Sequence, residues 1–235
     1  MFALWQWAGM SGVSIAFPSA TETLAALWEM LIDGSLLKAY GQTAGPLIVG
    51  VALTAVGGVF AGVVMGLSPK AEWLGLPVFI ILQASPSVAI IPLITFIYGI
   101  GFAAKVFAVV LLSAPVVVLN TYRGIAHTPR SLIEMSNAFL ASRWQRIWKI
   151  VIPAGSGLIF AGLRLGVAQG FTGAVLAELI ITPTGIGDLI TYNRSVVNYP
   201  AMFAVILSII IVASVSVTML QRLEKRLFRP EMRAL

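Results

Sequence analysis

Long apolar runs are the feature that most constrains how this chain folds. Several stretches of about 18 or more mainly apolar residues are present, and each is long enough to cross ~30 Å of hydrocarbon as one helix. Only 10% of the residues are charged, against about 25% in soluble domains. A backbone in lipid must satisfy its own hydrogen bonds, so such runs predict helices. The sequence therefore predicts an all-α polytopic membrane protein with five to six transmembrane helices.

The whole chain, 1–235, is expected to form one transmembrane domain. Residues 1–43 hold a short apolar segment, which is a short or partly interfacial helix, followed by an amphipathic surface helix. If the first segment crosses the membrane there are six spans, and otherwise there are five. The core spans are expected at 44–67, 74–97, 102–119, 154–181 and 201–221.

The cationic residues sort by loop, and this sorting predicts the orientation. Six fall in two loops, and five more fall in the tail 222–235: Lys70, Arg123, Arg130, Arg143, Arg146 and Lys149, then Arg222, Lys225, Arg226, Arg229 and Arg233. Because Lys and Arg accumulate on the cytoplasmic side, the loop 120–153 and the basic tail are expected in the cytoplasm. The net charge of +6 then reflects membrane orientation, and no nucleic-acid partner is expected.

The cytoplasmic loop is polar and basic, and its pattern predicts two short helices. The first is expected to begin with Pro129 at the first helical position, with Ser131 and Glu134 spaced as a capping pair. In the second, Ser142 and Gln145 form a capping box. An apolar stripe follows, made of Trp144, Ile147, Trp148 and Val151. From these residues alone, the helix either lies on the inner leaflet or docks onto a protein partner.

This loop resembles a motif of the permease subunits of bacterial ATP-binding-cassette importers. The family motif is Glu-Ala-Ala, three residues, Gly, nine residues, Ile, one residue, Leu-Pro. The chain has Glu134-Met135-Ser136, then Leu140, then Ile150, then Ile152-Pro153 at the same spacing. Further stretches are similar to the family and extend the resemblance over nearly the whole chain: FPSATETLAALWEML, SPSVAIIPLITFIYGIG, AGLRLGVAQGFTGAVLAELI and TGIGDLI. The nearest subgroup is the nitrate, sulfonate and taurine type.

The resemblance implies the fold of a type I importer permease, multi-pass in the bacterial cytoplasmic (inner) membrane. It implies a second permease subunit in a homodimer or heterodimer, two ATPase subunits that bind ATP and Mg²⁺, and an external binding protein. It also implies that the 134–150 helices couple to the ATPase, through Glu134, Met135, Ser136, Leu140, Ala141, Ser142 and Arg143. The chain itself has no GxxxxGK[ST] loop to hold ATP phosphates, and we expect no cofactor in it and no catalytic activity.

Leu140 replaces the glycine of the family motif. A glycine in a tight turn tolerates positive φ, which leucine does poorly. The favoured interpretation is a turn with ordinary dihedrals, which would allow helix to continue through Phe139-Leu140-Ala141. The alternative is altered coupling, as in a heterodimer whose other permease carries the stricter motif.

Polar residues within the spans are candidates for the translocation path or its gate: Gln83, Ser87, Gln169 and Glu178. They could equally form interhelical hydrogen bonds. Glu178 is either structural or gating, and Arg164 is expected to extend to the inner interface. The small-residue stripes along 58–66 and 162–174 predict close helix packing, and the stretch after Thr182 predicts a turn and a short helix at the outer mouth.

Other function classes have less support. A self-contained secondary carrier or channel is the rival interpretation. A membrane enzyme is disfavoured, because the sequence has one histidine and no cysteine from which to assemble a catalytic or metal site. The subgroup suggests a small solute as cargo, such as an organic or inorganic anion, a sulfonate, an aromatic carboxylate or a pyrimidine-like molecule.

Overall fold

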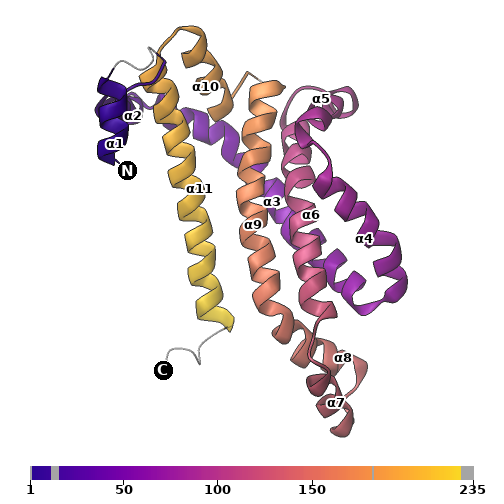
Figure 1. The fold of residues 1–235 in the computed structure, drawn as a ribbon. Helices are drawn as coiled ribbons and strands as arrows, with labels where there is room; N and C mark the ends of the chain where they lie inside the picture. The colour runs from indigo at the N-terminus through magenta and orange to yellow at the C-terminus, as the bar shows by residue number, and fades with distance from the viewer. Residues whose placement is uncertain (1, 12–15, 182, 229–235) are drawn as a thin grey trace.

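The computed structural model describes residues 2–11, 16–181 and 183–228, and every regular element among them is helical (Figure 1). In chain order the elements are α1 Phe2–Met10, α2 Ala20–Ile32, α3 Ser35–Leu67, α4 Pro69–Ala84, α5 Ser87–Tyr98, α6 Phe102–Ala126, α7 Arg130–Ala138, α8 Arg143–Arg146, the π-helical segment η1 Ile147–Val151, α9 Ile152–Ile180, α10 Ile186–Ser195 and α11 Tyr199–Phe228.

Four of these helical stretches are long and apolar enough to cross a membrane: Ser35–Leu67, Phe102–Ala126, Arg143–Ile180 and Tyr199–Lys225. A fifth crossing arises if α4 and α5 form one broken span. Helix α1 has 9 residues, or about 14 Å, so it is too short to cross the hydrocarbon core as a helix. The described residues thus support the lower end of the predicted range of spans.

The span expected over 74–97 is not one helix. Helices α4 and α5 meet at an angle of 109°. Ser85 ends α4 in an extended conformation, with φ −70° and ψ 141°, and Pro86 follows it. The proline ring disfavours helical dihedrals in the residue before it, so the helix stops here. Pro77 and Pro92 stand inside α4 and α5 and are tolerated, as expected.

Helix α6 stands beside α9, and α3 crosses the bundle and packs against α6 as well (Figure 1). Glycines bring the three backbones together. A Cβ at Gly62 of α3 would lie 2.5 Å from the Cβ of Thr121, and one at Gly166 of α9 would lie 2.4 Å from a methyl of Val117. The predicted packing role of both small-residue stripes is confirmed. Half of the apolar window of α6 is buried, against 17–28% for the other three spans, which leave apolar surface for lipid or a partner.

The bundle has two distinct ends. Helices α5 and α10 lie at one end, and α7 and α8 project from the other (Figure 1). We call these the α10 end and the α7 end. Helix α11 runs from the α10 end toward the α7 end, so the helix that leads into the basic tail and the basic loop share one end of the molecule.

Candidate functional site

Helix α7 ends in a tight turn, residues 139–142, which we call the α7–α8 turn. The N–H of Leu140 donates to the carbonyl of Asn137 at 2.9 Å, and the N–H of Ala141 donates to the carbonyl of Ser136 at 3.0 Å. This pair of bonds defines a Schellman motif, in which the residue after the C-cap is left-handed and usually glycine. Leu140 occupies that position with φ 54°. The favoured interpretation, that this turn has ordinary dihedrals, is therefore wrong.

Leucine at position 140 raises the free energy of the isolated chain for two reasons. A left-handed conformation costs a residue with a Cβ roughly 1–2 kcal/mol. In addition, Leu140 is 91% exposed, and the adjacent Phe139 is 81% exposed. Met135 and Trp144 on either side of the turn are exposed as well. Two backbone hydrogen bonds close the turn, but the side chains of Phe139 and Leu140 stay exposed, so the α7–α8 turn presents an uncovered apolar surface.

The start of α7 differs from the expectation. Pro129 is the N-cap, one residue before the first helical residue, and no side chain caps this end. Ser131 and Glu134 lie inside the helix, so the predicted capping pair does not form. Ser136 is buried and donates from its hydroxyl to the carbonyl of Ile133 at 2.6 Å. The other residues matched to the coupling motif lie on the surface or are half-buried: Glu134, Met135, Leu140, Ala141, Ser142 and Arg143.

The capping box at the second helix is confirmed. The N–H of Gln145 donates to the hydroxyl of Ser142 at 3.3 Å, and the N–H of Ser142 donates to the side-chain oxygen of Gln145 at 2.8 Å. From this cap, helix continues through α8, η1 and α9 as one stretch of 38 residues, Arg143–Ile180. At 1.5 Å per residue it is about 57 Å long. The α7–α8 turn is therefore joined directly to a membrane span.

The segment η1 is a widened turn in this long helix. The N–H of Ile152 donates to the carbonyl of Ile147, five residues back. Pro153 follows immediately, and a proline both lacks an N–H and crowds the carbonyl four residues before it. Single π-turns of this kind occur frequently at functional sites.

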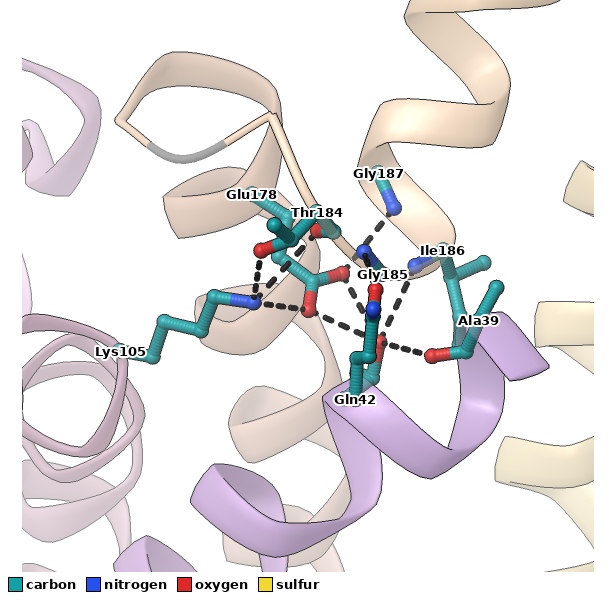
Figure 2. A network of polar contacts seen from close by, with 9 residues as sticks. Ala39, Gln42, Lys105, Glu178, Thr184, Gly185, Ile186 and Gly187 are labelled. Carbon is teal, nitrogen blue, oxygen red and sulfur yellow. Dashed lines mark hydrogen bonds and ion pairs between the residues drawn. The ribbon is translucent and has the colours of Figure 1, made fainter. Parts of the chain in front are cut away.

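A buried ion pair organises the α10 end (Figure 2). The ammonium of Lys105 on α6 lies 2.8 Å from a carboxylate oxygen of Glu178 on α9, and the two side chains are 6% and 0% exposed. Thr43 on α3 places its hydroxyl 2.8 and 3.0 Å from the two carboxylate oxygens, and the N–H of Gly187 donates to one of them at 3.0 Å. Lys105 also donates to the hydroxyl of Thr184 at 2.9 Å. Buried charges are tolerated when they are paired and hydrogen-bonded in this way.

The same network fixes the turn that precedes α10. The N–H of Gly185 donates to the side-chain oxygen of Gln42 at 2.8 Å, and the N–H of Ile186 donates to the hydroxyl of Thr43 at 3.1 Å (Figure 2). Gly185 has φ 83°, and a Cβ there would lie 2.2 Å from a carboxylate oxygen of Glu178. Glycine is thus required both by the backbone conformation and by the close approach. The predicted turn and short helix are confirmed by α10, although Thr182 lies outside the described residues.

Among the residues predicted for the path or gate, the described side chains lie on two helices, α4 and α9, and make no hydrogen bond to one another. Gln83 on α4 and Gln169 on α9 are exposed, and within the described part of the chain neither side chain makes a hydrogen bond. The side chain of Ser87 lies outside the described part of the structure. Glu178 is paired and buried, which fits its structural or gating interpretation better than contact with a cargo. The path assignments stay predictions.

A second ion pair joins α9 to α11 near the α7 end. Arg164 contacts the carboxylate of Glu224, and the two side chains are 23% and 8% exposed. The expectation that Arg164 extends to the inner interface stays a prediction, and the structure adds a partner, the carboxylate of Glu224 from α11. Sequence reasoning named neither Glu224 nor Lys105 as a partner. The presence of Arg164 and Glu178 within a predicted span did indicate that each has a partner, since an ionised side chain in a span requires a compensating charge.

No cluster of three or more potential metal ligands occurs among the described residues. His127, at the end of α6, places Nδ1 3.0 Å from the carbonyl of Arg123.

The amino-acid sequence of this chain is similar to those of several known permease proteins. The chain is 33% identical to the riboflavin transport system permease protein RibX of Chloroflexus aurantiacus over 155 residues, 66% of this chain and 58% of that protein. It is 27% identical over 232 residues to SsuC of Bacillus subtilis, which is named for aliphatic sulfonate transport, with 97% of this chain and 84% of that protein covered. It is 28% identical to the taurine transport system permease protein TauC of Escherichia coli over 72% of this chain and 62% of that one. The chain thus spans about three fifths of the riboflavin and taurine proteins.

The fold is shared with solved transporters. A chain of the MetNI methionine ABC transporter in an inward-facing conformation superposes with a TM-score of 0.67 at 17% identity, covering 83% of this chain and 94% of that one. A family model described as "Binding-protein-dependent transport system inner membrane component" matches residues 54–229. This match includes the α7–α8 turn, the long helix and Glu178, and the chain therefore belongs to the family of inner-membrane permease components of binding-protein-dependent transport systems.

Proposed function

We propose that this chain is the membrane-spanning permease subunit of an ATP-driven importer and that it couples to an ATPase through the α7–α8 turn. The observation that carries this proposal is the helical stretch from Arg143 to Ile180. It joins the exposed turn at one end of the bundle to the residue, Glu178, that holds the other end together.

The proposed partners follow from the family description. A second copy of the chain, or a related permease, completes the translocation path, and an external binding protein delivers the solute. Two ATPase subunits bind ATP and Mg²⁺, while this chain is non-catalytic. Its sequence has no GxxxxGK[ST] loop, so the energy must enter from a partner.

The α7 end is proposed to face the cytoplasm and the α10 end the outside of the bacterial cytoplasmic membrane. Arg143, Arg146 and Lys149 lie at the α7 end, and so does the end of α11 that leads to the basic tail. The bias of Lys and Arg toward the cytoplasmic side supports this orientation.

In the proposed mechanism, the long helix transmits movement between the two ends. A displacement of the α7–α8 turn by the ATPase shifts α9 as a unit, because the capping box and the backbone hydrogen bonds hold the stretch helical. Glu178 moves with α9 and displaces the turn before α10, because the N–H of Gly187 is hydrogen-bonded to its carboxylate. The same movement strains the bonds that join Glu178 to Lys105 and Thr43. This coupling is a form of rigid-body rocking around a central site, as in alternating access generally.

The proposed cargo is a small solute, such as a sulfonate, another organic or inorganic anion, an aromatic carboxylate or a pyrimidine-like molecule. Two relatives are named for the transport of aliphatic sulfonates and taurine, which fit this range, and a third is named for riboflavin, a larger heterocyclic molecule. Gln83 and Gln169 offer only neutral hydrogen-bonding groups. We therefore assign most of the discrimination to the binding protein.

Reconstitution tests the proposal. The chain is inserted into liposomes with the ATPase and binding protein encoded beside it, and ATP hydrolysis and solute uptake are measured. We expect hydrolysis to rise when loaded binding protein is added. Uptake by the chain alone, driven by an ion gradient, would instead support a secondary carrier.

A charge reversal localises the coupling. Glu134 is exposed on α7, so Glu134→Lys is expected to weaken ATPase binding and uptake while the bundle stays folded. Glu29→Lys makes the same change on exposed α2 at the other end, and it should leave ATPase binding unchanged. Equal ATPase binding by wild type and Glu134→Lys would remove Glu134 from the docking surface.

A further inference from the structure

Two residues with a Cβ adopt positive φ in the described part of the chain, and both close the same motif. Leu140 has φ 54° and Val197 has φ 61°. At the end of α10, the N–H of Val197 donates to the carbonyl of Arg194 at 3.3 Å, and the N–H of Asn198 donates to that of Asn193 at 2.9 Å. These are the two bonds that also close α7. The chain therefore carries the same unfavourable backbone feature once at each end of the bundle.

Resting on the proposed function, we infer that Leu140 is a specificity-determining anchor whose side chain fills an apolar pocket on the ATPase subunit. A permease with glycine at this position satisfies the turn but leaves such a pocket empty. Leu140 is 91% exposed and held in a conformation that glycine adopts without strain. Its side chain is therefore available to a surface outside this chain, and burial there would compensate the unfavourable backbone conformation.

The surroundings of Leu140 define the chemistry of that pocket. Phe139 is 81% exposed and Trp144 is 71% exposed, so the turn presents a contiguous apolar sequence flanked by aromatic side chains. Arg143 and Lys149 are exposed, and within the described residues neither forms an ion pair. The matching surface on the ATPase is apolar at its centre, with acidic groups facing Arg143 and Lys149 and a basic group facing Glu134.

A lipid surface is the competing occupant, and the placement of the turn argues against it. Helices α7 and α8 project beyond the ends of α6 and α9 (Figure 1). Trp148, one turn before α9 begins, is the aromatic residue placed to meet headgroups. Leu140 lies eight residues before Trp148, in the turn that precedes α8.

The test compares two matched variants, Leu140→Gly and Val197→Gly, in nanodiscs with the ATPase encoded beside this chain. Each variant relieves the backbone at one Schellman motif, but only the first removes the proposed anchor. We expect Leu140→Gly to weaken ATPase binding about tenfold, the loss expected from exposing a leucine side chain. The thermal stability of the permease alone should be unchanged or higher. Val197→Gly should leave the dissociation constant for the ATPase unchanged.

Partner exchange tests specificity. An ATPase whose own permease carries the motif glycine should bind Leu140→Gly at least as tightly as it binds wild type, whereas the cognate ATPase should bind Leu140→Gly more weakly. A photo-reactive side chain at position 140 should cross-link to the ATPase.

Three results would overturn the inference. Equal binding of the cognate ATPase to wild type and Leu140→Gly would mean that Leu140 is not an anchor, while the proposed function would stand. Cross-linking from position 140 to lipid in place of the ATPase would assign the turn to the membrane. A wild-type chain that binds no ATPase would overturn both this inference and the proposed function.

Discussion

Replacing Glu178 by glutamine tests what the buried network contributes. The amide keeps the size of the side chain but removes the charge that compensates Lys105, whose ammonium lies 2.8 Å away. Because the two side chains are 6% and 0% exposed, water screens neither charge. Removing one partner of a buried pair typically costs about 3–5 kcal/mol, since the other charge stays buried and uncompensated. We expect Glu178→Gln and Lys105→Met each to lower the free energy of unfolding by about this amount.

The double variant separates the pair from the remaining hydrogen bonds. Glu178→Gln/Lys105→Met leaves no uncompensated charge, and replacing both members of a buried pair is often close to neutral. The glutamine oxygen can still accept from Thr43 or Gly187. We therefore expect the double variant to cost less than either single variant, so that the two single effects are strongly non-additive.

The assay is equilibrium unfolding in mixed detergent micelles, followed by helical circular dichroism. Asp188→Asn is the matched control, because it makes the same chemical change on a partly exposed acid in the first turn of α10 and should cost less than about 1 kcal/mol. Additive single effects, each below about 1 kcal/mol, would refute the reasoning, because a coupled buried pair cannot behave in that way.

Three further predictions use the same unfolding assay or a local probe. Gly166→Ala should destabilise the bundle by about 1–3 kcal/mol, because its Cβ would lie 2.4 Å from a methyl group, while Gly57→Ala, with nothing within 4 Å, should be neutral or stabilising. Arg164→Met should cost about 1–3 kcal/mol by leaving Glu224 uncompensated, and less than Lys105→Met because Arg164 is partly exposed. Ser142→Ala should weaken the cap of α8 by about 1 kcal/mol, seen as faster amide hydrogen exchange at Gln145, with the unfolding of the bundle unchanged.

Each of these has an outcome that contradicts it. Equal stabilities of Gly166→Ala and Gly57→Ala would mean that α6 and α9 are not in close contact. Unchanged stability of Arg164→Met would mean that the ion pair between Arg164 and Glu224 does not stabilise the packing of α9 against α11. Unchanged exchange at Gln145 in Ser142→Ala would show that the capping box does not hold the start of the long helix.

The local features of this protein were predictable because they depend on neighbouring residues. The apolar runs that became α3, α6, α9 and α11 needed only the length of the hydrocarbon core. The capping box at Ser142 needed only a glutamine three residues later. The glycine stripes indicated packing, although they could not say that α6 would be the common partner of α3 and α9.

Prolines and turns were predicted less well, because the sequence does not show which conformational preference prevails. Pro77 and Pro92 stay inside helices, while Pro86 breaks one, so the presence of a proline in a span did not decide its effect. At Leu140, side-chain preference favours ordinary dihedrals. Two backbone hydrogen bonds that close α7 impose φ 54° instead, and the side chain gains no contact within the described chain.

The sequence by itself thus determined the class of protein, the expected orientation and the capping box at Ser142, because hydrophobicity, charge and capping act over a few neighbouring residues. The tertiary structure decided which charges meet. Glu178 and Lys105 are 73 residues apart, and Arg164 and Glu224 are 60 apart. Only the packing of α3, α6, α9 and α11 brings these groups together. An uncompensated charge is costly inside a membrane, so the sequence required that partners exist, and the fold alone determined which they are.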